Sequence, residues 1–306
     1  MRVEAEAVEY LRFEDGSPVR AASAVARFGD GFLVSQDDAT SACWWRSGVG
    51  TPVRLLPPVD GHDTFSEAEH TKALKPDLEA ALHVTLDDAP AVLLLGSGST
   101  EARMRAVLVG LLDGVPWAVS RDLPPLYALV ADLLGVDPEQ LNLEGACVLD
   151  GVLRWFHRGR PAAGLSSSSV DLDLAALVAA VAGRAEPADL HATGVRTYDV
   201  GDVEGVGLAI TDAVVLPDGA VLVSAAAEDS PNAYDDGPVR GSALAVLHGS
   251  RVSATAAIPR IGGRVAKVEG LALLAWGEHG GRVLAVVDED DPTAASALLT
   301  LRVSLP

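Results

Sequence analysis

Four glutamates recur along the chain at nearly equal spacing, each between an apolar residue and a small one. Glu79, Glu144, Glu204 and Glu269 are 65, 60 and 65 residues apart, and a degenerate fifth copy places Ser23 at 56 residues before Glu79. Carboxylates that converge on one point cannot all stay ionised, so protons or a cation must compensate them. An oxygen ring without His or Cys suits Ca²⁺ better than Mg²⁺. We therefore predict Ser23 and the four glutamates as calcium ligands.

The same pattern has a structural alternative. A glutamate at the start of a strand can accept backbone N–H groups from a neighbouring sheet and hold the two sheets together without any metal. The small residues after the glutamates fit either case, because both require the backbones to crowd around one axis. The spacing alone leaves both interpretations open.

A set of basic residues stands out because the protein is otherwise acidic. Lys267 lies two residues before Glu269, so strand alternation points both side chains the same way. Arginines and lysines around such a site suit an anionic substrate such as a phosphate ester. The alternative for each is a surface cation paired with an acidic neighbour. The predicted substrate-binding residues are Arg103, Arg105, Arg158, Arg240 and Lys267.

The repeat predicts the elements that position these residues. Each of five units reads as four short strands separated by turn signals, and this predicts an all-β fold, a β-propeller with five blades favoured over six. The last unit has only three strands, so we expect the N-terminal segment V-E-A-E-A-V-E-Y-L to supply the fourth and close the ring. Residues 1–306 are then one propeller domain.

Two segments show helical rather than strand periodicity. P-L-Y-A-L-V-A-D-L-L-G begins at Pro125, and L-D-L-A-A-L-V-A-A-V-A-G-R begins at Leu172. We expect both as inserts on the rim of the propeller. An α/β fold would need such helices between all strands, and residues 204–306 contain none.

The ends of the second strands in each unit are polar and should reach one face of the propeller. Loops on a rigid scaffold are where sites usually form, so we expect a polar mouth there. Taken singly, each of these residues is explained by a solvated turn. The set comprises Gln36, Asp37, Asp38, residues 96–99, His157, Arg158, Glu228, Asp229 and residues 288–291.

Composition excludes several classes of protein. The 23 basic and 43 acidic residues give a formal charge of −20, which repels nucleic acid and anionic membranes. Hydrophobic residues make up 49%, enough for a full core. Cys43 and Cys147 are expected as buried thiols, and the N-terminus does not read as a signal peptide. We therefore expect a cytoplasmic protein.

Several of these motifs resemble an uncharacterised actinobacterial β-propeller family, similar in style to phytase-like and esterase-like propellers. The segments are L-L-G-S-G-S at Leu94, L-N-L-E-G-A at Leu141, Y-D-D-G-P-V-R-G-S at Tyr234 and K-V-E-G-L-A at Lys267. The ring of one serine and several glutamates also resembles the central calcium site of calcium-activated nucleotidases. That resemblance implies the same five calcium ligands, with a glutamate here in place of one hydroxyl ligand.

Two classes of function follow. The first is a calcium-dependent hydrolase of a phosphate ester or related anionic small molecule, in which the cation polarises the substrate. The second is a non-catalytic propeller that binds a small molecule or a protein partner. No recognisable catalytic base separates them, so whether the protein is an enzyme stays open at this point.

Overall fold

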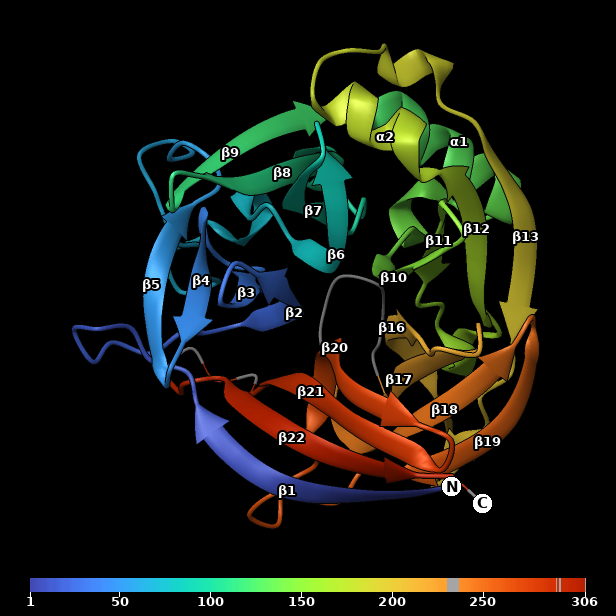
Figure 1. Cartoon of the computed structure of the whole chain (residues 1–306). Coiled ribbons are helices and arrows are strands. Elements are labelled where there is room, and N and C mark those ends of the chain that lie inside the picture. Colours follow the sequence, from blue (N-terminus) through green and yellow to red (C-terminus); the bar gives the residue numbers. More distant parts are fainter. Residues whose placement is uncertain (230–236, 290, 292, 306) are drawn as a thin grey trace.

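Five four-stranded antiparallel sheets stand around a central axis (Figure 1). This computed structural model describes the chain except residues 230–236, 290, 292 and 306, so part of the motif at Tyr234 lies outside the described residues. The five-bladed propeller predicted from the repeat is confirmed.

The blades follow one another along the chain, and the first strand of each lies nearest the axis. Blades 1 and 2 are formed by β2 (Ala22–Phe28), β3 (Gly31–Gln36), β4 (Ser41–Arg46) and β5 (Val49–Arg54), and by β6 (Leu78–Leu86), β7 (Ala89–Gly96), β8 (Arg105–Leu112) and β9 (Val115–Asp122). Blades 3 and 4 are formed by β10 (Leu143–Leu149), β11 (Val152–His157), β12 (Ser167–Asp173) and β13 (Ala192–Tyr198), and by β16 (Ala209–Val215), β17 (Val221–Glu228), β18 (Val239–His248) and β19 (Arg251–Ala257).

Blade 5 joins the two ends of the chain. It contains β20 (Lys267–Gly277), β21 (Gly280–Asp288), β22 (Ala297–Ser304) and, as its outer strand, β1 (Arg2–Tyr10). β1 runs antiparallel to β22 from the pair Arg2–Ser304 to the pair Tyr10–Ala297. The predicted closure by the N-terminal strand is therefore confirmed.

A β-bulge interrupts the start of every inner strand. The register shifts where Ser23, Glu79, Glu144, Thr211 and Glu269 stand. A bulge re-aims a side chain and bends the strand locally. The repeat is therefore one bulge per blade, occupied by three glutamates and two hydroxyl residues.

Glu204 does not belong to this ring, and its predicted place beside the axis is wrong. It lies with Gly205 in the turn between two short strands, β14 (Asp202–Val203) and β15 (Val206–Gly207), and it is exposed. Both turn residues have positive φ, +54° and +81°, as a two-residue hairpin turn of type I′ requires. Thr211, seven residues later, occupies the bulge of blade 4.

Small residues next to the bulges let the inner strands approach closely. A Cβ added at Gly145 would lie 2.3 Å from the Cα of Asp212, and one at Gly270 would lie 2.7 Å from the Cα of Ala24. Real Cβ atoms do not approach backbone so closely, so the crowding predicted at the axis is confirmed at these two glycines.

The two predicted helices lie on the outer rim beside blades 2 and 3 (Figure 1). α1 (Pro124–Leu134) has proline in its first turn and ends at Gly135 in the left-handed conformation. α2 (Leu174–Val181) is capped by the Asp173 carboxylate, which accepts the Ala176 N–H. Both helices pack apolar faces into the core between these blades.

The core consists of five apolar clusters, one between each pair of neighbouring blades. Cys43 and Cys147 are buried in two of them as free thiols, as predicted. Burial raises the pKa of both thiols to about 12, so they are inert packing groups.

Candidate functional site

A pocket lies at the end of the axis where the inner strands begin. Its empty volume is about 1070 Å³, a figure that includes open solvent at its mouth. Residues from all five blades line it.

Strand alternation brings two positions of each blade to this pocket. Four of the five bulge residues line it, and the residue two positions earlier lines it in every blade. These earlier residues are Ala21, Asp77, Asn142, Ala209 and Lys267. The ends of the second strands add Asp37, Arg158, Glu228 and Asp288, so four residues of the predicted polar mouth line the pocket.

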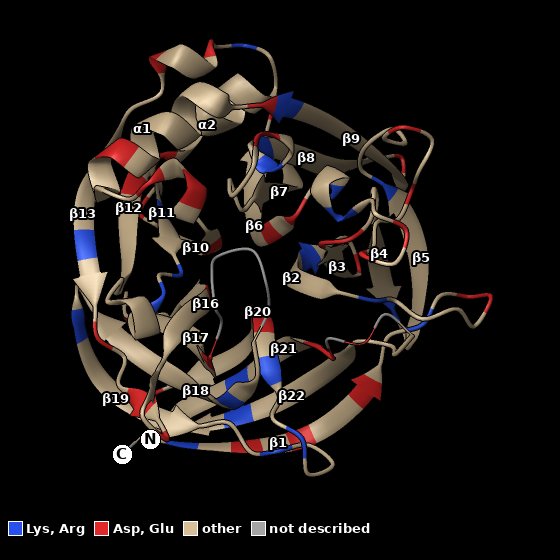
Figure 2. Ribbon diagram, turned by 180° about the vertical axis from the view of Figure 1, so that it is seen from behind, with Lys and Arg blue, Asp and Glu red and all other residues tan. Residues whose placement is uncertain are grey.

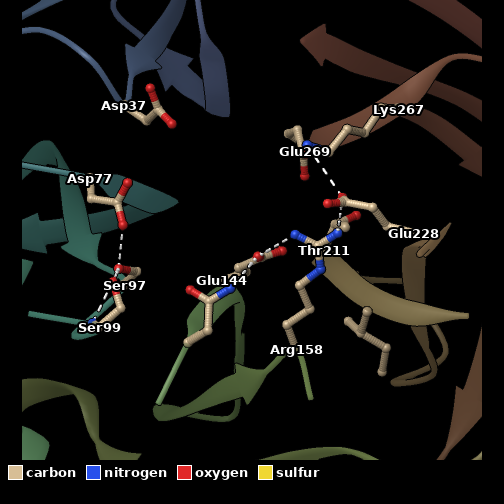
Figure 3. Close-up of polar contacts among 12 residues, drawn as sticks. Asp37, Asp77, Ser97, Ser99, Glu144, Arg158, Thr211, Glu228, Lys267 and Glu269 are labelled. Atoms are coloured by element: carbon tan, nitrogen blue, oxygen red, sulfur yellow. Dashed lines mark hydrogen bonds and ion pairs between the residues drawn. The ribbon is translucent and has the colours of Figure 1, made fainter. Parts of the chain in front are cut away.

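One charged group comes from blades 1 and 2. The Lys75 ammonium lies 2.7 Å from the Asp37 carboxylate and 2.6 Å from that of Asp77, and the Arg103 guanidinium lies 2.9 Å from Asp77. Ser97 donates a hydrogen bond to Asp77 from the side (Figure 3). Burial alone would raise the pKa of Asp77, but Lys75 and Arg103 outweigh it and lower that pKa to about 2.

A second charged group comes from blades 3, 4 and 5 and lies across the axis from the first (Figure 3). Arg158 bridges two carboxylates, Glu144 at 2.9 Å and Glu228 at 2.6 Å. Lys267 lies 3.4 Å from Glu228 and 3.2 Å from Glu269. Figure 2 shows the same mixture of acidic and basic segments on the inner strands and loops around the axis.

Two carboxyl groups of the ring are shifted towards their neutral form. Burial raises the pKa of Glu144 to about 8, with the charge of Glu269 adding to the effect and Arg158 opposing it. Burial and the charges of Asp77, Asp37 and Glu144 raise the pKa of Glu79 well above its ordinary value. Both shifts favour the protonated, neutral form of these groups in the folded protein.

These protons change the charge of the pocket. Seven acidic and six basic residues line it among the described residues. With Glu79 and Glu144 neutral, the basic side chains outnumber the ionised acidic ones by one. The repulsion predicted among the carboxylates is therefore relieved by protons and by Lys and Arg side chains.

The two hydroxyl residues of the ring donate hydrogen bonds to neighbouring blades. Ser23 Oγ donates to the Leu78 carbonyl at 2.6 Å, and Thr211 Oγ1 donates to the Val268 carbonyl at 2.6 Å. Asp212, next to Thr211, accepts the Leu271 N–H at 2.6 Å. The carboxylate-to-backbone contact considered from sequence thus exists, but it is made by Asp212.

The predicted site residues divide into two groups. Most line the pocket: Ser23, Glu79, Glu144, Glu269, Arg103, Arg158 and Lys267. The other three lie elsewhere. Arg105 pairs with Asp122, Arg240 is half exposed beside Asp229, and Glu204 is in its hairpin turn.

The residues of the bulge ring and the pocket that sequence reasoning missed include Lys75, Asp77, Asn142 and Thr211. Asp77 and Asn142 stand two residues before a glutamate, as Lys267 does, so the alternation used for Lys267 would have found them. Thr211 stands in I-T-D-A-V, which matches L-E-G-A-C around Glu144 in polarity at every position except the third.

Four of the five predicted calcium ligands line the pocket and Glu204 does not, and calcium binding itself stays a prediction. Ser23 is held by Leu78, Glu269 faces Lys267, Glu144 faces Arg158, and Glu204 is remote. A different trio fits a cation better, because ligand oxygens of Asp37, Asp77 and Glu79 lie within 4.8 Å of one another. The Lys75 ammonium already bonds two of these three carboxylates.

A family model described as a family of unknown function, DUF6910, matches residues 71–292. The chain belongs to this family. The match covers blades 2 to 4 and reaches β21 of blade 5, so it includes most of the pocket. The predicted resemblance to an uncharacterised propeller family is confirmed at that level, while its phytase-like, esterase-like and nucleotidase aspects stay predictions. No curated protein matches the sequence.

Several solved structures are similar in outline. A hypothetical protein from Leishmania major is 12% identical with a TM-score of 0.49, over 98% of this chain and 91% of that one. The mannose phosphorylase MPT-4 from Leishmania mexicana, in complex with phosphate ion, is 13% identical with a TM-score of 0.47, over 97% and 88%. The aldose sugar dehydrogenase from Streptomyces coelicolor is 11% identical with a TM-score of 0.42, over 97% and 98%. At these values the likeness carries no argument about activity.

Among the described residues, no helix is both long and apolar enough to cross a membrane.

Proposed function

We propose that the axial pocket binds a small molecule carrying an anionic group, and that the protein is a hydrolase of a phosphate ester or a related anionic molecule. The observation that carries the proposal is the set of four cationic side chains buried in one pocket. Lys75, Arg103, Arg158 and Lys267 have only 4% to 15% of their side-chain surface exposed.

Charge supports an anionic ligand over a cationic one. The whole chain carries a formal charge of −20, yet the described lining of the pocket is close to neutral once Glu79 and Glu144 are protonated. Charged groups in a partly enclosed pocket act with less screening than groups on the surface. An oxyanion can therefore gain charge-assisted hydrogen bonds from the buried Arg and Lys side chains.

Isothermal titration with sulfate, inorganic phosphate and a neutral monosaccharide tests the binding. We expect both anions to bind and the sugar not to bind. Lys267→Met should weaken anion binding about tenfold or more, since one charge-assisted hydrogen bond contributes about 1.5–3 kcal/mol. Arg240→Met is the matched control and should leave the affinity unchanged. Equal effects of the two variants, or no anion binding by the wild type, would refute the proposal.

Turnover separates the two functional classes. A hydrolase should release phosphate from at least one member of a phosphate-ester panel, and Lys267→Met should slow that release while Arg240→Met does not. Binding without release from any ester would favour the non-catalytic propeller.

Calcium is the second part of the proposal, and the trio Asp37, Asp77 and Glu79 favours it. A calcium ion there would have to displace the Lys75 ammonium as the counter-charge. At a hundredfold excess over its dissociation constant, a ligand specific to the folded state stabilises the protein by about 2.7 kcal/mol. Calcium should thus raise the melting temperature, a chelator should reverse the rise, and Asp37→Asn should abolish it. A melting temperature that is the same with calcium and with chelator would rule out this cofactor.

A further inference from the structure

We infer that Arg160 is the main contact of the ligand's anionic group, which its guanidinium binds inside the axial pocket. The inference rests on the proposed function and deepens it, because it names the side chain that recognises the anion. Arg160 lies in the loop between β11 and β12, two residues after Arg158. It is partly buried and lines the pocket.

Arg160 differs from the other basic residues of the pocket in having no carboxylate partner. Each of the other five contacts at least one carboxylate: Lys72, Lys75, Arg103, Arg158 and Lys267. An anion that binds those five must compete with the carboxylates already beside them. Across the described chain, the Arg160 guanidinium forms neither a hydrogen bond nor an ion pair with another residue. Its positive charge is therefore not divided with an acidic group.

The guanidinium of Arg160 is also accessible. Its nitrogens have no partner, yet none is among the buried, unsatisfied polar atoms of the described side chains, so all of them reach solvent. The next residues along the chain, Gly159 and Pro161, line the pocket as well and carry no charge that would repel an anion. A guanidinium presents parallel N–H groups that match two oxygens of a phosphate, sulfate or carboxylate group.

The backbone of Arg160 is held in place by its surroundings. Its N–H donates to the Leu165 carbonyl at 2.7 Å, and its carbonyl accepts the Leu165 N–H at 3.1 Å. Pro161 packs against β15, since a Cβ added at Gly207 would lie 2.4 Å from the Pro161 Cβ. A donor on a fixed backbone loses less conformational freedom when a ligand binds.

Isothermal titration of Arg160→Met with sulfate tests the inference. We expect the affinity to fall about tenfold or more, because the variant loses charge-assisted hydrogen bonds to the anion. Its melting temperature should match that of the wild type, since the lost guanidinium bonds no described residue. Arg251→Met is the matched control, because Arg251 is exposed at the start of β19, outside the described lining of the pocket. It removes the same charge from the chain and should leave the affinity for sulfate unchanged.

A second measurement uses the wild type alone. Phenylglyoxal modifies accessible arginine side chains, and mass spectrometry of the resulting peptides gives the rate at each position. Sulfate should slow the modification of Arg160 and leave that of Arg251 unchanged.

Equal affinities of Arg160→Met and Arg251→Met for sulfate would overturn the inference, and so would a modification rate of Arg160 that sulfate does not change. If Lys267→Met weakens sulfate binding while Arg160→Met does not, the inference fails and the proposed function stands. No binding of sulfate or inorganic phosphate by the wild type would overturn the proposed function itself.

Discussion

Several carboxyl groups crowd around one axis here, and each is compensated in one of three ways. Asp77 stays ionised because Lys75 and Arg103 contact it. Glu228 shares Arg158 and Lys267 with its neighbours. The raised pKa values of Glu79 and Glu144 favour their protonated forms, and Arg158 also contacts Glu144. A chain with so large an excess of acid can therefore gather acidic repeats around one axis and still bury several Lys and Arg side chains among them.

Among single residues of the pocket, we expect the loss of Arg158 to lower the free energy of unfolding most. Arg158→Met leaves Glu144 and Glu228 without their common guanidinium, and breaking a buried ion pair costs about 3–5 kcal/mol. The free energy of unfolding from urea denaturation measures this. Arg105→Met removes a partly exposed pair with Asp122 and should cost about 0–1 kcal/mol. Equal losses in the two variants would contradict the buried network.

The raised pKa of Glu144 predicts how stability depends on pH. The folded state holds a proton that the unfolded chain releases near its ordinary pKa, so stability is full below that value and is lost as pH rises towards about 8. Glu79 and Asp212 have pKa values raised mainly by burial and act in the same direction. Each such group contributes a slope of about 1.4 kcal/mol per pH unit within its range.

Urea denaturation at a series of pH values should show this fall, and Glu144→Gln should make it shallower. Asp77 acts oppositely, because its lowered pKa gives stability that is lost only as the pH falls towards about 2. A free energy of unfolding whose dependence on pH between about pH 5 and pH 8 is the same in the wild type and in Glu144→Gln would count against a protonated Glu144 in the fold.

At the scale of elements, the blades are held together beside the axis by short hydrogen bonds. Thr211→Val keeps the shape of the side chain but removes the donor to the buried Val268 carbonyl. Leaving that acceptor unsatisfied should cost about 1–3 kcal/mol. Thr255 on β19 is exposed, so Thr255→Val is the control and should change the free energy of unfolding by less than about 0.5 kcal/mol. If Thr211→Val is as stable as this control, the Thr211 hydroxyl does not stabilise the contact between blades 4 and 5.

The elements also show where sequence reasoning succeeds. Strand and helix periodicity identified the blades and both helices, since burial against neighbouring blades dictates that pattern.

The dipeptide Glu-Gly occurs in two different local structures that look alike in sequence. At Glu144 it forms a bulge beside the axis, and at Glu204 it forms a hairpin turn. Only the pairing of β16 with β17 decides between them, and that pairing depends on the whole sheet.

The site was harder to predict than the fold for a related reason. Alternation places Lys267 and Glu269 on one side of their strand, and the structure confirms that both line the pocket. Whether Arg103 or Arg105 reaches the axis depends on a short loop before β8, where no periodic pattern applies. The protonation of Glu144 depends on burial and on four charged groups from other parts of the chain, which no local pattern contains.

At the scale of the whole molecule, the ring depends on β1 to complete blade 5. β1 pairs with β22 along its length, Val3 is buried, and Glu6 forms ion pairs with Arg282 and Arg302. Leu11, just beyond the strand, is fully buried and donates its N–H to the Ser296 carbonyl. Deleting Met1 to Phe13 would remove all of these contacts and leave β22 as an open edge.

We expect this truncation to destabilise all five blades together, because each blade in the closed ring packs on two neighbours. The melting temperature should fall in a single transition, and the loss should exceed that of Glu6→Gln, which removes the ion pairs but keeps the strand. Supplying residues 1–13 after residue 306 through a flexible linker should restore stability, since Arg2 at the start of β1 pairs with Ser304 at the end of β22. Such a rearranged chain would show that closure, rather than the position of the strand in the sequence, holds the ring. A truncated protein that melts at the wild-type temperature would show that the ring is stable without β1.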